Sequence, residues 1–560
     1  MKMRKTVLAL AAFAVAVVLV PIAGAAGDPS PRGVENAKTT EVQILGLNDF
    51  HGAIQEPGGS GGRIGATNAG GAEYLATHVR NLRAENPNTL FVSAGDLIGA
   101  TPLISALFHD EPTIEAFNLM GLDYNGVGNH EFDEGVDELL RMQDGGCHPD
   151  DGCQDGDGFA GASFDFLAAN VAYKESGQTI LAPYKIRQFP GVKVAIVGMT
   201  LEGTPDIVTP AGIQSVDFLD EAETVNALVP ELKRQNVETI IVLLHEGGRV
   251  AGPLNETTID DCNSPSGALP PIVDAMDDEI DVVVTGHTNW AVNCEIDGKI
   301  VTGAASNGRL VTDIDLTVSR ASKDVVSATV DNRIVTRTVE KAPDLTALVA
   351  KYAALVAPLS NRVVGSTTTA ITRAANAAGE SALGDVIADA QLAATADPLF
   401  GGAVVAFMNP GGIRNDLPAG PVTYGQLFSV QPFNNVLTVL TCTGAQIDAL
   451  LEQQFDNPAA GANRILQVSE GFSYTWDASE PKGSKVDIAS ISIGGTPISP
   501  LASYRVTLNN FIATGGDGFT TFLGCTNPLG GEIDLDALVR YFDVNSPVAP
   551  GPQDRISVQP

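Results

Sequence analysis

The sequence predicts an α/β protein made of two large domains. Its 560 residues exceed what one hydrophobic core usually contains, so at least two domains are expected. Between residue 41 and about residue 318, apolar runs of strand type alternate with helical patterns, which is typical of an α/β domain. A helical segment at 342–365 follows, and the amphipathic pattern at 379–397 opens a second domain.

Residues 1–26 are expected to form a signal peptide. Residues 1–5 are basic, residues 6–20 are apolar but short for a membrane span, and the small residues at 23–25 suit cleavage. An uncleaved anchor is the alternative interpretation of this pattern. Because no second span follows, we expect the mature protein to have no membrane span and to be secreted or held in the cell envelope.

The first domain, residues 27–340, is expected to contain a strand at each of several apolar runs, which end in polar or glycine residues. Two segments between them, 71–87 and 220–236, have helical periodicity. The glycine-rich stretch 56–72 lacks the Gly-Lys-Ser/Thr ending of a phosphate-binding loop, so we interpret it as a loop that enters a helix. The expected strands are EVQILGLND (41–49), TLFVSAGD (89–96), VKVAIVGMT (192–200), TIIVLLHEGG (239–248) and DVVVTGHTN (281–289).

Residues 341–361 are expected to form a helix that connects the two domains, because their helical periodicity is bounded by Pro343 and Pro358. The second domain then covers residues 362–545. The last segment, 546–560, is rich in proline and is expected to be a frayed or extended C-terminal tail.

The chain is strongly acidic, with a formal net charge of −34. Such a surface repels nucleic-acid backbones and anionic membranes, so we expect neither as a partner. An anionic substrate would therefore have to be bound by locally placed cationic side chains or by metal ions.

The six cysteines are an even number, which indicates disulfides in an exported protein. The acidic segment 147–159 resembles part of a calcium loop, but no carboxylate occupies the twelfth position counted from Asp151. We therefore interpret it as a solvated insertion held by a disulfide. His78, His109 and His148 are interpreted as structural or surface residues. Proximity along the chain and the domain boundary favour the pairs Cys147–Cys153, Cys262–Cys294 and Cys442–Cys525.

Histidine, aspartate and asparagine recur where the expected strands end or in neighbouring polar turns. One such residue is more often a hydrogen-bonded turn residue than a ligand. Their repetition predicts one shared site, because loops at strand ends of an α/β sheet line a common crevice. The residues concerned are Asp49, His51, Asp96, Asn129, His130, Asp133, His245, His287 and Asn289.

This donor set mixes oxygen and nitrogen atoms and contains no thiolate, which suits two divalent cations. Asp96, the only such residue in its motif, is expected to bridge them. Two such cations can activate water and bind phosphoryl oxygens. Zn, Mn, Co and Mg all suit these ligands, so the identity of the metal stays open. The remaining ligands are assigned as Asp49, His51 and Asn289 to one cation, and as Asn129, His245 and His287 to the other.

His130 and Asp133 are expected to act on the substrate. Their i, i+3 spacing lets the carboxylate orient the imidazole and favour its protonated form. A protonated imidazole beside the cations can stabilise charge on phosphoryl oxygens or protonate the leaving alkoxide.

The motifs NDFHG, GD, GNHEFD, a histidine after an apolar strand and GHTN resemble those of the calcineurin-like metallophosphatase superfamily. Within it, the chain is similar to the two-domain 5′-nucleotidases, which include UDP-sugar hydrolases and ecto-5′-nucleotidases. The resemblance implies an N-terminal β-sandwich flanked by helices and a C-terminal α+β substrate-binding domain. It also implies that the second domain rotates about the connecting helix.

The resemblance extends to the second domain through NPGGIR (409–414), VQPFNN (430–435) and NNFIATGGDGF (509–519). It implies that Phe433 and Phe511 stack on the base, which suits aromatic side chains, although each could instead be a core residue. It further implies that Asp517 binds the ribose, and that Asn409 and Arg414 make polar contacts to the nucleotide.

Two positions depart from the family pattern. Pro410 replaces a glycine found in many relatives. Many relatives also carry one or two arginines just before the second domain's first helix, whereas only Arg373 is present here, several residues further back. Arg373 is expected to reach the phosphate of the substrate from a longer loop. Alternatively, the cations and Arg414 bind the phosphate without Arg373.

The sequence therefore predicts an exported, two-metal phosphohydrolase that releases phosphate from nucleoside 5′-monophosphates. Nucleoside di- and triphosphates and nucleotide sugars are further candidates. The same scaffold would also suit a 2′,3′-cyclic-nucleotide phosphodiesterase or a sulfur-oxidation hydrolase. Alternatives of another class are a non-catalytic nucleotide- or metal-binding protein and a structural adhesin. The sequence does not determine the base preference or the oligomeric state.

Overall fold

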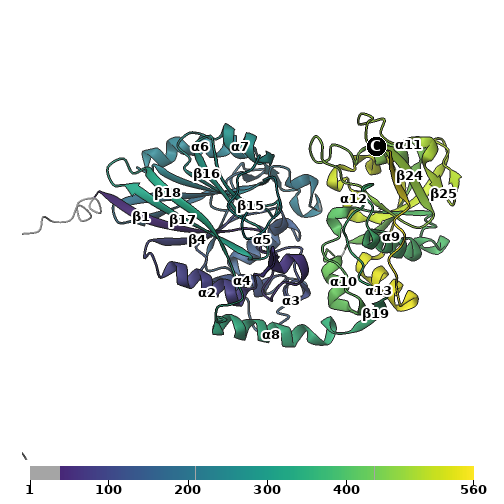
Figure 1. The fold of residues 1–560 in the computed structure, drawn as a ribbon, viewed down its shortest axis with the longest axis horizontal. Coiled ribbons are helices and arrows are strands. Elements are labelled where there is room, and N and C mark those ends of the chain that lie inside the picture. Colours follow the sequence, from purple (N-terminus) through teal and green to yellow (C-terminus); the bar gives the residue numbers. More distant parts are fainter. Residues whose placement is uncertain (1–37, 209, 434, 560) are drawn as a thin grey trace, which may run out of the picture.

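The computed structural model describes residues 38–208, 210–433 and 435–559. The chain forms two lobes joined by one long helix, α8, which runs along the bottom of Figure 1. The expected signal peptide, residues 1–26, lies outside the described residues. None of the described helices has both the length and the apolar character needed to span a membrane.

The N-terminal lobe is a sandwich of two six-stranded sheets, as the resemblance implied. β1 is parallel to β4, and β11 is parallel to β9 and β14, so the polar segments that follow these strands reach the same edge of their sheet. In sheet order, the first sheet contains β18 (Val325–Ile334), β17 (Leu310–Ser319), β1 (Thr39–Leu47), β4 (Thr89–Ser93), β5 (Tyr124–Gly126) and β6 (Asp165–Leu167). The second contains β15 (Ala291–Ile296), β16 (Lys299–Ala304), β14 (Val282–Thr285), β11 (Thr239–His245), β9 (Val192–Thr200) and β8 (Tyr184–Phe189).

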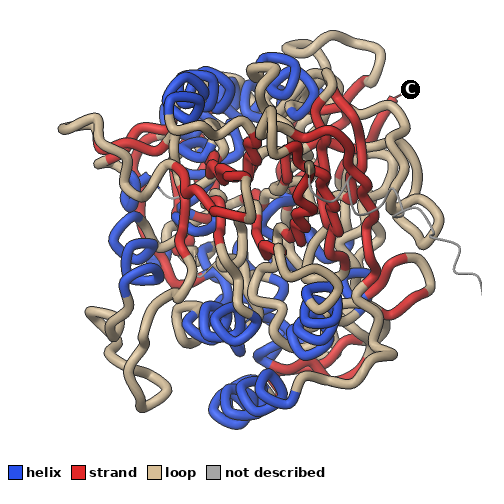
Figure 2. Tube along the Cα trace, turned by 90° about the vertical axis from the view of Figure 1, so that its left-hand side faces the viewer, coloured by secondary structure: helices blue, strands red, loops and turns tan. Residues whose placement is uncertain are grey.

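Apolar side chains fill the space between the two sheets, and helices cover both outer faces. Ile44 and Val92 of the first sheet pack with Ile241 of the second, and all are fully buried. Because these strands are buried on both faces, their sequences are continuous apolar runs. Figure 2 shows the strands in the middle of the molecule with helices around them. The covering helices are α2 (Ala72–Arg83), α4 (Glu111–Met120) and α5 (Val136–Asp144) on the first sheet, and α6 (Glu221–Arg234) and α7 (Leu269–Ala275) on the second.

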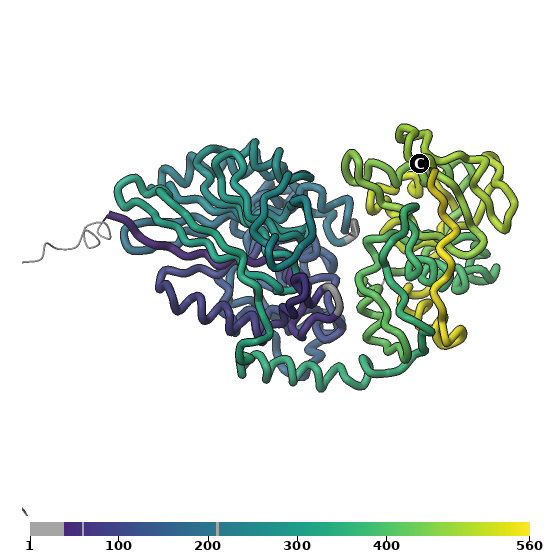
Figure 3. Tube along the Cα trace, viewed as in Figure 1, coloured from purple at the N-terminus to yellow at the C-terminus, as the bar shows by residue number. Residues whose placement is uncertain are grey.

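The connecting helix α8 (Pro343–Ser360) lies where a helix was expected. Pro343 occupies its first turn, where a backbone N–H has no partner within the helix. The absence of this N–H in proline therefore costs no hydrogen bond. Tyr352 is fully buried and its ring contacts that of Phe108 in the N-terminal lobe. The helix packs against α2, α3 (Leu103–Ala106) and α4 on one side and α10 (Tyr424–Val430) on the other, and Figure 3 shows the chain following it between the lobes.

The C-terminal lobe contains a five-stranded and a four-stranded sheet. Helices α9 (Ala382–Thr395) and α13 (Asp534–Asn545) pack together, and α11 (Gly444–Glu452) and α12 (Asn510–Ala513) lie near the strands. In order, the larger sheet contains β23 (Gln467–Val468), β20 (Val405–Met408), β27 (Ser503–Asn509), β22 (Val436–Thr443) and β28 (Thr526–Ile533). The smaller contains β26 (Thr496–Pro497), β25 (Ser492–Ile493), β24 (Phe472–Asp477) and β29 (Ile556–Gln559).

The C-terminal tail is extended but belongs to this lobe. β29 pairs in parallel with β24. The buried carboxylate of Glu380 accepts hydrogen bonds from the backbone N–H groups of Arg555 and Ile556, 3.0 and 3.1 Å long. Short two-stranded pairs complete the fold: β2 (Arg63–Ile64) with β3 (Thr67–Asn68), β7 (Val171–Tyr173) with β10 (Val216–Phe218), β12 (Gly248–Arg249) with β13 (Ser266–Gly267), and β19 (Val363–Thr367) with β21 (Gly420–Thr423).

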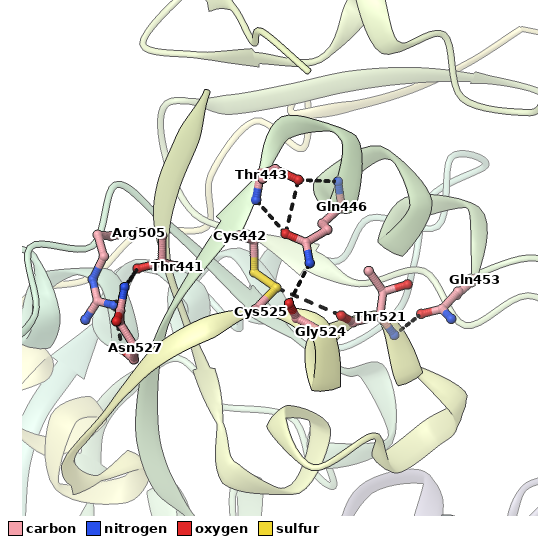
Figure 4. Close-up of a disulfide and its surroundings, with 10 residues drawn as sticks. All are labelled: Thr441, Cys442, Thr443, Gln446, Gln453, Arg505, Thr521, Gly524, Cys525 and Asn527. Carbon is pink, nitrogen blue, oxygen red and sulfur yellow. Dashed lines mark hydrogen bonds between the residues drawn. A yellow bond between two sulfur atoms is a disulfide. The ribbon is translucent and has the colours of Figure 1, made fainter. Parts of the chain in front are cut away.

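The structure confirms the three expected disulfides. Figure 4 shows the longest-range of them, which joins Cys442 at the end of β22 to Cys525. Beside it, the side chain of Gln446 donates to the carbonyl of Gly524 at 2.7 Å. This corner of the lobe is therefore held by a covalent link and by a hydrogen bond.

Replacing both Cys442 and Cys525 with alanine is expected to lower the free energy of unfolding by about 4–5 kcal/mol, because the bond closes a loop with a sequence separation of 83 residues. The matched control replaces Cys147 and Cys153, whose separation is only 6 residues, and is expected to lose about 2 kcal/mol. Urea denaturation followed by fluorescence measures both losses. Equal losses would contradict the loop-entropy argument.

Candidate functional site

Residues that follow strands of both sheets meet at one point of the N-terminal lobe. The Oδ2 atom of Asp96, after β4, lies 3.1 Å from Nε2 of His245 and 3.8 Å from Nε2 of His51. The Oδ1 atom of Asn129 lies 3.1 Å from Nε2 of His245 and 2.9 Å from Nδ1 of His287. Asp96 thus lies between His51 and His245, and its role as a bridging ligand stays a prediction.

Asp49 and Asn289 lie beside this cluster. The carboxylate of Asp49 accepts a hydrogen bond from the backbone N–H of His287, 2.9 Å long, so it is at the same point. The amide of Asn289 donates to the carbonyl of His287 at 3.1 Å, which leaves its own carbonyl oxygen as the potential ligand atom. Both residues remain proposed ligands.

The loops that carry these residues have an unusual backbone. Asp49, His51, Asp96, His287 and Asn289 all have positive φ values, between 46° and 66°. Such strain in non-glycine residues persists only where the surroundings enforce it, and it concentrates at functional sites.

Two glycines allow the loops to approach one another. A Cβ atom on Gly128 would lie 2.3 Å from Oδ1 of Asp96, and one on Gly95, whose φ is +89°, would lie 2.6 Å from the backbone nitrogen of Gly128. The glycines in the GD and GNH motifs are therefore required by packing of the loops, not only by the turns.

Glu131 is a residue of the site that sequence reasoning missed. It is buried, and its carboxylate accepts hydrogen bonds from the backbone N–H groups of Asp96, Leu97 and Gly128, 2.7–3.0 Å long. It therefore ties the loop after β4 to the loop after β5 and fixes the backbone of Asp96. The sequence feature that could have identified Glu131 is its position directly after His130.

The protonation states of the histidines suit metal binding. The carbonyls of Gly99 and Ala94 accept from Nδ1 of His51 and of His245, at 3.0 and 2.7 Å, which turns each Nε2 toward Asp96. Nε2 of His51 is buried and has no hydrogen-bond partner among the described residues. Burial lowers the pKa of His51 and of His287 to about 3, so both are neutral at pH 7.

The pKa of His245 differs from those of His51 and His287, because a negatively charged side chain lies beside its ring. Burial alone would lower its pKa, but the neighbouring Asp96 carboxylate raises it to about 10. A cation bound at Asp96 would take the place of this proton, since metal ligands must be deprotonated. The donor set, with a buried imidazole nitrogen that lacks a partner, therefore fits divalent cations.

The expected pair of His130 and Asp133 is formed. Nδ1 of His130 donates to the Asp133 carboxylate at 2.7 Å, which directs Nε2 away from it. Burial opposes the charged form of His130, but Asp133 and Asp96 together raise its pKa above the ordinary value. The backbone N–H of His130 also donates to Oδ1 of Asp96 at 3.0 Å, which fixes the pair relative to the cluster.

A cavity of about 210 Å³ lies between the two lobes and joins this cluster to the aromatic residues of the second domain. The rings of His130 and Phe433 lie nearly parallel, with centroids 5.9 Å apart. Lining residues from the N-terminal lobe include Asn129, His130, Asp133 and His287, and those from the C-terminal lobe include Asn409, Arg414, Phe433, Phe511 and Asp517.

Asp517 is held by two neighbours, one of which sequence reasoning missed. Oδ2 accepts from the amide of Asn409, and Oδ1 accepts from Nη1 of Arg464, both at 2.7 Å. Arg464 also lines the cavity. It lies in no motif that the sequence analysis identified, so only the folded chain places it at the site.

Arg373 faces a different space. It lines a neighbouring cavity of about 430 Å³ with Ser381 and Asp416, and its Nη1 donates to the carbonyl of Ile413 at 3.3 Å. The guanidinium of Arg414 instead lies 5.8 Å from the ring centroid of Phe433, inside the interlobe cavity. Of the arginines in the described part of the chain, Arg414 and Arg464 therefore line the cavity beside the cluster.

Comparisons with known families support both halves of the chain. Residues 42–290 match the family model described as calcineurin-like phosphoesterase, and residues 363–524 match that of the 5′-nucleotidase C-terminal domain. The chain is 34% identical to endonuclease YhcR of Bacillus subtilis over 92% of its own length, but it spans only 41% of that relative. It is 32% identical to cell wall protein Lmo0130 of Listeria monocytogenes, covering 90% of this chain and 67% of that one.

A solved structure has the same two-lobed fold. The 5′-nucleotidase precursor of Thermus thermophilus aligns with a TM-score of 0.77 and 26% identity, over 93% of this chain and all of that one. At the sequence level, a 5′-nucleotidase of Vibrio cholerae is 25% identical, and the match covers 95% of both chains.

Proposed function

The chain belongs to the two-domain 5′-nucleotidase family of calcineurin-like phosphoesterases, and from this premise we propose that it releases phosphate from nucleoside 5′-monophosphates. The observation that carries the proposal is the interlobe cavity. It is lined by two of the side chains proposed to bind metal, Asn129 and His287, and by those proposed to bind a nucleoside, and the ring centroids of His130 and Phe433 lie 5.9 Å apart across it.

The residues proposed to hold the two cations are Asp49, His51, Asp96, Asn129, His245, His287 and Asn289. Two divalent cations would supply activation of water and charge neutralisation of phosphoryl oxygens. The chain's own contribution is to fix these ligands: Glu131 holds the Asp96 backbone, and backbone carbonyls hold the imidazoles of His51 and His245.

His130 is proposed to act on the leaving group. Because Asp133 accepts from Nδ1 and favours the protonated ring, Nε2–H can donate to the ester oxygen of the nucleotide and protonate the departing 5′-hydroxyl. Arg414, on the opposite lobe, has the charge and shape to bind a phosphoryl oxygen.

The nucleoside is proposed to lie between Phe433 and Phe511. Aromatic faces stack on any base, so this contact favours nucleotides over small phosphate esters without selecting one base. The carboxylate of Asp517, oriented by Asn409 and Arg464, can accept from ribose hydroxyls. Arg373 stays a proposed phosphate contact, although it lines the neighbouring cavity.

A substrate panel tests the proposed function. AMP, ADP, ATP, UDP-glucose, 2′,3′-cyclic AMP and thiosulfate are incubated with the protein and Mn²⁺, and the products are separated by chromatography before and after chelation, because opening of the cyclic diester or cleavage of UDP-glucose releases no free phosphate. We expect AMP to be hydrolysed, and hydrolysis to stop when EDTA removes the metal. Hydrolysis of the cyclic nucleotide alone, or of none of these compounds, would refute the proposal.

Replacing Phe511 with alanine is expected to lower kcat/KM for AMP about 5- to 100-fold, mainly through KM, because one stacking contact is lost. Hydrolysis of p-nitrophenyl phosphate, which has no base, is expected to change less than twofold. Phe400→Ala is the matched control, since the Phe400 side chain is 61% exposed and outside the cavity. Equal losses on both substrates would argue against a stacking role.

We also propose that the chain acts outside the cytosol. Disulfides are rare in cytosolic proteins, and all the cysteines of the described chain are paired. Expression from its full sequence, followed by N-terminal sequencing of the protein in the envelope and culture fractions, tests this. Recovery of the uncleaved chain from the cytosol would contradict it.

A further inference from the structure

A second cluster of metal-ligating side chains lies on the N-terminal lobe, apart from the site described above. It brings together His109, between α3 and α4, Glu134, which follows the catalytic pair, and His148 and Asp151 from the loop closed by the Cys147–Cys153 disulfide. We propose that this cluster binds a divalent transition-metal ion, for which Zn²⁺ is the probe.

The hydrogen bonds of His109 match those of a metal-bound histidine. Its Nδ1 lies 2.8 Å from the Glu134 carboxylate, and its Nε2 lies 3.0 Å from Oδ2 of Asp151. A ligating imidazole typically donates its other ring N–H to a carboxylate, which fixes the tautomer and the ring. Glu134 has that orienting position, and Nε2 is the atom that would bind the ion.

His148 and Asp151 supply the other donors. Nδ1 of His148 accepts a hydrogen bond from the backbone N–H of Asp151 at 3.2 Å and lies 3.8 Å from the Asp151 carboxylate, so an ion bound at Nδ1 would take the place of this hydrogen bond. Imidazole nitrogen with carboxylate oxygen is a set that Zn²⁺ accepts readily. Two imidazoles distinguish this cluster from an ordinary group of surface acids.

The loop that carries two of these residues is held in place. The disulfide closes it over a sequence separation of 6 residues, and the N–H of Gly152 donates to the carbonyl of His148 at 2.9 Å. The imidazoles of His109 and His148 are only 16% and 14% exposed, whereas the carboxylates of Asp151 and Glu134 are about half exposed. An ion can therefore enter from the carboxylate side and meet His109, which Glu134 already holds.

Binding requires one local adjustment. The rings of His109 and His148 are stacked, with centroids 3.7 Å apart and planes 4° from parallel. A bound ion lies in the plane of each imidazole, so one ring must turn out of the stack to share it. His148 is the ring that can turn, because it lies on a surface loop.

Proton release should accompany binding. Burial lowers the pKa of His109, but Glu134 and Asp151 together raise it to about 9, so the free cluster holds a proton at pH 7 that the ion would displace.

A different acidic cluster of the described residues is already neutralised by a lysine side chain. Glu115, Asp155 and Asp157 also cluster, but the ammonium group of Lys351 on α8 lies 2.7 Å from Asp155 and 3.3 Å from Asp157. That lysine supplies the positive charge itself. Among the described residues, the nearest partners of His109 and His148 are carboxylates and each other, so the positive charge of this cluster is a proton on His109, which an ion can displace whereas it cannot displace a lysine.

Metal stoichiometry tests the proposal. The full chain is stripped with chelator, dialysed against Zn²⁺ at pH 7.5, and analysed for bound zinc by mass spectrometry. We expect the wild type to bind one equivalent more than His148→Ala, and Asp151→Asn to bind this equivalent at least tenfold more weakly. His78→Ala, a histidine on α2 outside every cluster, is the matched control and should keep all equivalents.

Two further measurements make the result decisive. Asp151 is half exposed, so Asp151→Asn is expected to fold even if His148→Ala does not, and circular dichroism checks both variants. Co²⁺ added to the wild type should give a d–d absorption band that Asp151→Asn weakens and His78→Ala retains. If the variants and the wild type bind the same number of zinc ions with the same affinity, the cluster is no metal site. These counts do not depend on phosphohydrolase activity.

Discussion

Replacing Asp96 with asparagine is expected to remove most of the bound metal and to lower kcat/KM for AMP by at least about three orders of magnitude. Asp96 lies between two proposed ligands, with its carboxylate 3.8 Å from His51 and 3.1 Å from His245. Asparagine keeps the size and one oxygen but removes the negative charge that would attract both cations, and metal stabilisation of charge is worth several kcal/mol. The loss should appear in metal content as well as in rate.

Metal analysis beside phosphate-release assays measures both effects. The matched control is Asp217→Asn, because the Asp217 side chain is 57% exposed and pairs only with Lys174 at the surface. It should keep the metal and the activity of the wild type. If Asp96→Asn retained two cations and full turnover, Asp96 would not bridge them and the site would need another arrangement.

Replacing His130 with alanine is expected to lower kcat for AMP about 10²- to 10⁴-fold while metal content stays near that of the wild type. The imidazole holds the proton proposed for the leaving group, and Asp133 orients it at 2.7 Å. Its backbone N–H, which holds Asp96, survives the substitution. The ligands should therefore remain in place although the acid is gone.

Steady-state kinetics with AMP, together with metal analysis, separates these two roles. A poor leaving group needs the acid most, so p-nitrophenyl phosphate, whose leaving group departs easily, should lose much less activity than AMP. His78→Ala is again the control, since its ring bonds only to the carbonyl of Thr336 on another part of the lobe. Metal loss, or an equal loss on both substrates, would assign His130 to metal binding rather than to proton transfer.

The position of His130 links the two lobes. It is fixed to the N-terminal cluster through Asp96 and Asp133, and its ring lies against Phe433 of the C-terminal lobe. A nucleotide whose base lies against Phe433 would thus have its ester bond close to the imidazole proposed to protonate it. This arrangement depends on the packing of α8 against both lobes, which buries Tyr352 and Val356.

The sequence by itself determined the features that depend on local patterns. Continuous apolar runs predicted strands β1, β4, β9, β11 and β14 because a strand buried on both faces must be apolar throughout. Polar residues after those runs predicted which side chains would lie close together, since the carboxyl ends of parallel strands lie at the same edge of a sheet. Short separations and the domain boundary predicted the disulfides.

Only the tertiary structure decided the features that depend on distant segments. Arg464 rather than Arg373 lines the cavity, because the path of a loop, not a motif, determines which guanidinium reaches Asp517. The carboxylate of Glu380 and the backbone of β24 hold the tail by bonding to its backbone, far along the chain from either of them. His109 and His148, interpreted from sequence as structural or surface residues, stack against each other across 39 positions of the chain because a disulfide loop folds back. Proximity of this kind is a property of packing, so single-sequence patterns cannot specify it.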